Sequence, residues 1–175
     1  METTVPFPDQ ESCSCDAERS LTNAQSFTVA PATGGGWPAW TAAFTRLLVQ
    51  LAVEPAHCVV VTQEPNLRYV QLMVGHGHAH VEASSNTYLM GDFQLSPTEE
   101  RVLEQLGFQH PDQLDPASTL PENWWFDADD ADPVRIAEVL TAAMIGVMAF
   151  DARWPLTIEI FGAESPCNAC FWADS

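Results

Sequence analysis

The sequence predicts an α+β domain in which an antiparallel sheet of three to five strands is flanked by about three helices. Three apolar, strand-like stretches follow one another between residues 57 and 84, and their links are too short for a parallel crossover. Stretches with helical spacing lie before and after them. The predicted order is helix, three strands, helix, strand, helix, strand, where the last two strands have the weaker patterns.

The first helix is predicted in "GWPAWTAAFTRLLVQLAVEP". Pro38 suits a first helical turn, and Pro55 ends the pattern. One face is strongly aromatic and must pack on something large. Its members are Trp37, Trp40, Phe44, Leu47, Leu48 and Leu51.

Three strands are predicted next, at 57–63, 67–74 and 79–84. If His76 and Gly77 form a two-residue loop, Val70 faces Ala83 and Met73 faces His80. This register places the apolar residues on one face, and a slip of one residue would destroy that sorting. The polar face then collects Tyr69, Gln71, Met73, His78, His80 and Glu82.

The later elements carry clear boundary signals. Ser96 and Glu99 have the spacing of a capping box, and Gly107 is predicted to end that helix. Asp132 has the position of an N-cap for a third helix, which begins at Pro133. Short strands are predicted at 124–126 and 154–162.

Composition predicts one domain at residues 37–162, between a flexible acidic tail at 1–36 and a second tail at 163–175. The chain has 24 acidic residues against 6 basic ones, all of them Arg, and a net charge of -18. This charge argues against nucleic-acid and membrane partners, which need clustered cations. Without a transmembrane stretch or a secretory signal, a cytoplasmic location is expected.

Two groups of residues could hold a metal ion. His78, His80 and Glu82 share one hairpin face, and Cys13, Cys15, Cys167 and Cys170 could form a zinc centre if the termini met. A solvated hairpin face is favoured for the first group, because a dedicated site needs three or four converging ligands. For the second, the long separation of the two pairs differs from compact zinc modules.

No catalytic motif is recognisable: the chain has no GxSxG, no HExxH and no phosphate-binding glycine loop. A non-enzymatic protein without a cofactor is therefore expected. The aromatic residues are the remaining signal, because an outward tryptophan can belong to a partner-binding surface. The candidates are Trp124, Trp125, Phe126, Tyr69 and Met73.

Several stretches together resemble the TY-Chap domain, an actinobacterial group similar to type III secretion chaperones of the CesT kind and to YbjN-like proteins. They are "RYVQLMV", "HVEASSN", "LSPTEERVLEQLGF", "ENWW" and "PVRIAEVLTAAMIGVMAF", within residues 37–160. The resemblance implies a helix-flanked antiparallel sheet that binds a peptide or protein client. The negative charge suits basic or amphipathic clients. Relatives of this fold often dimerise, so an exposed apolar helix face is a candidate surface for a homodimer.

Overall fold

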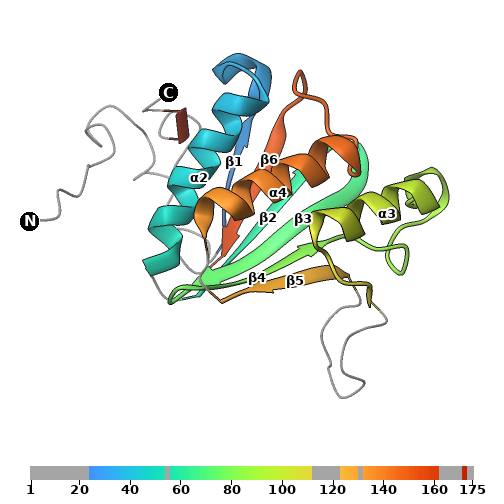
Figure 1. Cartoon of the computed structure of the whole chain (residues 1–175). Coiled ribbons are helices and arrows are strands. Elements are labelled where there is room, and N and C mark those ends of the chain that lie inside the picture. Colours follow the sequence, from blue (N-terminus) through green and yellow to red (C-terminus); the bar gives the residue numbers. More distant parts are fainter. Residues whose placement is uncertain (1–23, 54–55, 112–122, 130–131, 162–170, 173–175) are drawn as a thin grey trace, which may run out of the picture.

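Six strands form one antiparallel sheet in the order β1-β6-β2-β3-β4-β5, and the helices lie over one of its faces (Figure 1). The computed structural model describes residues 24–53, 56–111, 123–129, 132–161 and 171–172. The predicted α+β class is confirmed. The elements are β1 Ala24–Val29, η2 Pro31–Gly34, α2 Trp37–Val53, β2 His57–Gln63, β3 Asn66–Gly75, β4 His78–Ala83, η3 Gly91–Phe93, α3 Pro97–Leu106, β5 Trp124–Ala128, α4 Pro133–Gly146 and β6 Leu156–Phe161.

The sheet has one strand more than the three to five expected, and the additional strand is β1. It pairs with β6 along its whole length, from Ala24 opposite Phe161 to Val29 opposite Leu156. Its Phe27 and Val29 side chains are buried in the core. The part of the predicted N-terminal tail that follows residue 23 is therefore ordered, and residues 1–23 lie outside the described residues.

A short segment near the other end of the chain also joins the core. Phe171 is buried, and its ring centroid lies 5.7 Å from that of Phe27 and 6.1 Å from that of Trp40. Phe171 and Trp172 fall within the predicted C-terminal tail, 163–175, and both are packed against the core. The other residues of that tail lie outside the described ones.

The β3–β4 hairpin has the predicted register, from Val70 opposite Ala83 to Gly75 opposite His78. Its two turn residues both have positive φ, 53° at His76 and 74° at Gly77. Two-residue hairpin loops favour this backbone because it continues the twist of the strands.

The helix boundaries follow the predicted signals. The Ser96 side chain accepts a hydrogen bond from the Glu99 backbone N–H, and the Glu99 side chain accepts one from the Ser96 N–H. Gly107 ends α3 in a left-handed conformation, with φ of 98°. At the start of α4, the Asp132 side chain accepts hydrogen bonds from the N–H groups of Val134 and Arg135.

The core lies between the sheet and the layer formed by α2 and α4. The Trp40 and Phe44 rings stack at 4.7 Å, and the hydroxyls of Thr41 and Thr141 join α2 to α4 at 2.9 Å. Figure 1 shows both helices above the same face, with α3 beside α4. Within the described ranges, no helix has the length and apolar character needed to cross a bilayer.

Candidate functional site

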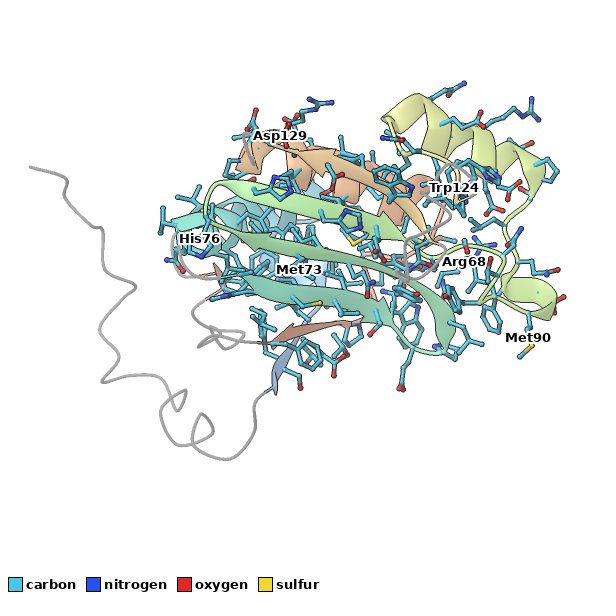
Figure 2. The ribbon with its side chains drawn as sticks, turned by 90° about the horizontal axis from the view of Figure 1, so that it is seen from below. Arg68, Met73, His76, Met90, Trp124 and Asp129 are labelled. Carbon is cyan, nitrogen blue, oxygen red and sulfur yellow. The ribbon has the colours of Figure 1, made fainter. Side chains whose placement is uncertain are left out.

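The sheet has a second face on which no helix packs in the part of the chain that the structure describes. Figure 2 looks onto this face and shows Met73 near its middle. We call it the open face. It carries the alternate residues of β2 to β6 that point away from the core, namely Cys58, Val60, Thr62, Leu67, Tyr69, Gln71, Met73, His78, His80, Glu82, Trp125, Asp127, Thr157, Glu159 and Phe161.

A buried carboxylate organises the polar part of the open face. Glu82 is only 6% exposed and accepts hydrogen bonds from Gln71 Nε2 at 2.5 Å and Asn123 Nδ2 at 2.8 Å. Asn123 Nδ2 also donates to the Tyr69 hydroxyl at 3.0 Å. Burial alone would raise the pKa of Glu82, but the hydrogen bonds from His80, Asn123 and Gln71 together hold it below its ordinary value. Glu82 is therefore an anion fixed between three strands.

His80 joins β4 to β5 on this face. Its Nε2 lies 3.0 Å from Glu82 Oε1, and its Nδ1 lies 2.6 Å from Asp127 Oδ1. The hydrogen bond with Glu82 is the largest influence on the pKa of His80; with the Asp127 bond it outweighs burial and raises that pKa to about 8. The ring also stacks on Trp125, with 5.9 Å between centroids. The imidazolium is thus the favoured form at neutral pH.

Apolar side chains are exposed beside this network. Leu67 is 57% exposed and Met73 52%, while Phe161 at the end of β6 is 39% exposed. These three side chains make the open face partly apolar as well as polar.

The structure separates the predicted partner-binding residues into two groups. Tyr69, Met73 and Trp125 lie together on the open face. Trp124 and Phe126 point the other way and are 1% and 9% exposed, so they belong to the core beneath the helices. Successive strand residues alternate between faces, so the pair of adjacent tryptophans could not share one surface.

The histidine ligands predicted as a metal alternative do not converge. His80 is engaged with Glu82 and Asp127, whereas His78 Nδ1 lies 3.4 Å from Asp129. Over the described ranges, no group of three or more His, Cys, Asp or Glu side chains is arranged to hold a metal ion. Cys13, Cys15, Cys167 and Cys170 lie outside the described residues.

A second feature was not predicted from the sequence. A cleft of about 580 Å³ opens between the β2–β3 turn, η3 and the loop from α4 to β6, and we call it the turn cleft. Arg68, which lines it, is 7% exposed although it is a charged strand residue. Its position in the β3 alternation, two residues before Val70, places it on the core face. The alternation of residues along β3 could therefore have predicted from the sequence that Arg68 is buried.

Comparison with known proteins agrees with this architecture. The model of the TY-Chap3 family, described as T3SS (YopN, CesT) and YbjN peptide-binding chaperone 3, matches residues 30–162. No curated protein and no solved structure is significantly similar to the chain. The family match begins at the last residue before η2 and ends one residue after β6, so among the elements that the structure describes it spans α2, α3, α4 and the strands β2 to β6. The chain therefore belongs to the TY-Chap3 family of peptide-binding chaperones.

Proposed function

We propose that this protein is a non-enzymatic chaperone module that holds an extended segment of a client peptide or protein on the open face. The observation that carries the proposal is the exposure of Met73 and Leu67, more than half in each case, on a sheet face that the helices leave uncovered. The family description, a peptide-binding chaperone, supports the same activity.

The exposed apolar side chains suit varied client sequences. Met73 lies on β3, in the interior of the sheet, and its flexible thioether side chain adapts to different partners. Leu67 lies on the same strand and face. A client that covers both would remove apolar surface from water, which is the main source of binding energy in such contacts.

The polar network beside them gives the surface a fixed shape. Gln71, Asn123 and His80 all hold the Glu82 carboxylate, so these side chains are ordered before a client arrives. A preformed surface loses less conformational entropy on binding than a mobile one. The network therefore supports binding without a reorganisation of the sheet.

Charge indicates the chemistry of the client. The open face carries Glu82, Asp127 and Glu159, and the whole chain has a net charge of -18. A basic amphipathic segment would place its apolar side chains on Met73 and Leu67 and its cations toward Asp127 and Glu159, which reach the surface, whereas Glu82 is buried. Such a client would also be kept in solution by the acidic surface that surrounds it.

The test uses a fluorescent decapeptide in which leucine alternates with serine and lysine. Its binding to the full chain is measured by fluorescence anisotropy. Met73→Asp should weaken binding about tenfold or more, because it places a charge where the client would cover an exposed methionine. Val134→Asp is the matched control, since Val134 is 52% exposed but lies on α4 above the other face. Equal weakening by the two substitutions, or by neither, would contradict the proposal.

Self-association is a separate prediction. Val49 and Val53 are both exposed on α2 and offer an apolar helix face for a second copy. Sedimentation of the wild type and of Val53→Asp would test it: a dimer that this substitution dissociates is the expected result.

A further inference from the structure

The turn cleft lies apart from the centre of the open face. Arg68 marks its place in Figure 2, at the end of the sheet opposite the hairpin tip at His76. Its volume of about 580 Å³ lies within the range of ligand pockets, which is roughly 300–1,000 Å³. It is large enough for a long side chain together with the backbone beside it.

The one arginine that lines the cleft has no donor left for a ligand. The Arg68 guanidinium has five N–H groups, and five hydrogen bonds are formed. They go to the backbone carbonyls of Phe93, Gln94 and Val147 and to both oxygens of Glu99. The side chain is 9% exposed and its charge is compensated by Glu99. An anionic ligand would therefore gain little from Arg68.

The start of α3 is also unavailable to an anion. The N-terminal N–H groups of a helix often bind phosphates or carboxylates. Here the Ser96 side chain occupies the Glu99 N–H, and the Glu99 carboxylate occupies the Ser96 N–H. The chain's own capping box has taken the place that an anion would use.

The remaining charges of the cleft are negative. Glu64 and Asp92 line it and are exposed, and Asp151 contributes a third carboxylate that is bound to Arg153 at the surface. The Gln63 side chain beside them is held by the backbone of Asp151 and Trp154. The cleft thus combines a fixed polar floor with carboxylates at its rim, a combination that attracts a cation.

An aromatic wall completes the cleft. Trp154 lines it and is 61% exposed, so most of its indole is open to a ligand. Cations bind over the face of tryptophan, and the planar guanidinium of arginine also stacks on it. Arginine is thus better matched than lysine, since its fork also pairs with a carboxylate through two hydrogen bonds.

We propose that the turn cleft binds an arginine side chain of the client, stacked on Trp154 and paired with the carboxylates of Glu64 and Asp92. This inference rests on the proposed function, because it assigns the arginine to a client peptide. It adds a polar anchor to the apolar contacts of the open face. A client would then be selected by an arginine placed beside its extended apolar segment.

The experiment is a titration of the ¹⁵N-labelled full chain with N-acetyl-arginine methylamide, followed through the Trp154 indole N–H signal. Trp154→Phe identifies that signal by its loss. The arginine compound should shift it saturably, and the lysine analogue should bind more weakly. The citrulline analogue, which has the same shape without charge, should bind at least fivefold more weakly. Equal binding of citrulline would overturn the proposal, and equal binding of the lysine analogue would overturn the assignment to arginine.

Charge-matched variants separate the cleft from the general acidity of the chain. Glu64→Gln with Asp92→Asn should raise the Kd of the arginine compound about fivefold. Glu104→Gln with Glu138→Gln removes the same charge from exposed positions on α3 and α4 outside the cleft and should leave the Kd unchanged. If both double variants weaken binding alike, the attraction is nonspecific and the proposal fails.

A last comparison distinguishes this inference from the proposed function. Met73→Asp should leave binding of the arginine compound unchanged, although it weakens the leucine-containing decapeptide. A wild-type chain that binds the decapeptide but not the arginine compound would overturn the cleft alone. The reverse result would overturn the open face as the client surface.

Discussion

His80 and Glu82, two residues apart on β4, face each other with 3.0 Å between Nε2 and Oε1. The other ring nitrogen of His80 lies 2.6 Å from Asp127. A neutral imidazole has a single N–H, so only the protonated ring donates to both carboxylates. The pair is therefore a charged link between β4 and β5.

This link predicts a pH dependence of stability. The pKa of His80 is raised from 6.5 to about 8, so the folded state binds the proton more tightly than the unfolded chain does. The resulting contribution, about 2 kcal/mol at most, is fully present below pH 6.5 and is lost as the pH rises through 8. Urea unfolding should show that His80→Gln lowers the free energy of unfolding more at pH 6 than at pH 9.

The control for this effect lies on the same hairpin. His76 at the turn has a positive φ of 53°, which asparagine tolerates well. His76→Asn should therefore change the free energy of unfolding only slightly. If the loss of stability in His76→Asn depended on pH as strongly as that in His80→Gln, the link between His80, Glu82 and Asp127 would not be the cause of the pH dependence.

The buried Arg68 predicts a large loss of stability on conservative substitution. Lysine offers three donors instead of five and cannot serve Phe93, Gln94, Val147 and Glu99 together. Arg68→Lys should cost about 3 kcal/mol in the free energy of unfolding. Arg101→Lys, at an exposed position on α3, should stay within about 0.5 kcal/mol of the wild type. Urea unfolding of the two variants checks this. Similar unfolding midpoints would show that the Arg68 contacts contribute little to stability.

The adjacent tryptophans predict opposite phenotypes. Trp124 is 1% exposed in the core, so Trp124→Ala should cost about 3–5 kcal/mol. Trp125 is half-buried on the open face against His80, and Trp125→Ala should cost about 1 kcal/mol while weakening decapeptide binding. Thermal unfolding and anisotropy measured on both variants check this. A larger loss of stability for Trp125→Ala would contradict the assignment of faces.

The β3–β4 turn predicts that replacing Gly77 lowers stability through backbone conformation alone. Gly77 has φ of 74°, and a Cβ added there would meet no atom within 4 Å. Gly77→Ala should therefore cost about 1 kcal/mol through conformation rather than collision, and Gly77→Asn should cost less. Denaturant midpoints for the two variants provide the measurement. An asparagine variant as unstable as the alanine variant would point to a different cause.

Local patterns were enough to predict most of the fold. The capping box at Ser96, the N-cap at Asp132 and the hairpin register around His76 and Gly77 depend on residues a few positions apart. The alternation of residues in β3 and β4 also predicts that Tyr69 and Met73 lie on the polar face, as they do. These features are encoded where they occur, so a single sequence suffices to find them.

The missed features depend on residues far apart in the chain. β1 is a strand only because β6 supplies a neighbour, with Phe27 opposite Ile158. The burial of Arg68 depends on Glu99 and on the carbonyl of Val147, which belong to other elements. Likewise, the turn cleft exists only where three separate loops meet. A local sequence pattern does not predict contacts between distant residues. The residues of the open face were therefore predicted in part, whereas the turn cleft was not.

The position of β6 has a consequence for synthesis of the protein. β6 is the last strand that the structure describes, yet it lies between β1 and β2. Until the ribosome has released residues 156–161, β1 has no neighbour on the side that β6 will occupy, and β2 has an unpaired edge. Incomplete chains would therefore expose strand edges that promote aggregation. The protein is proposed to bind extended segments of other chains. During its own translation, it too exposes strands that have not yet found their neighbours.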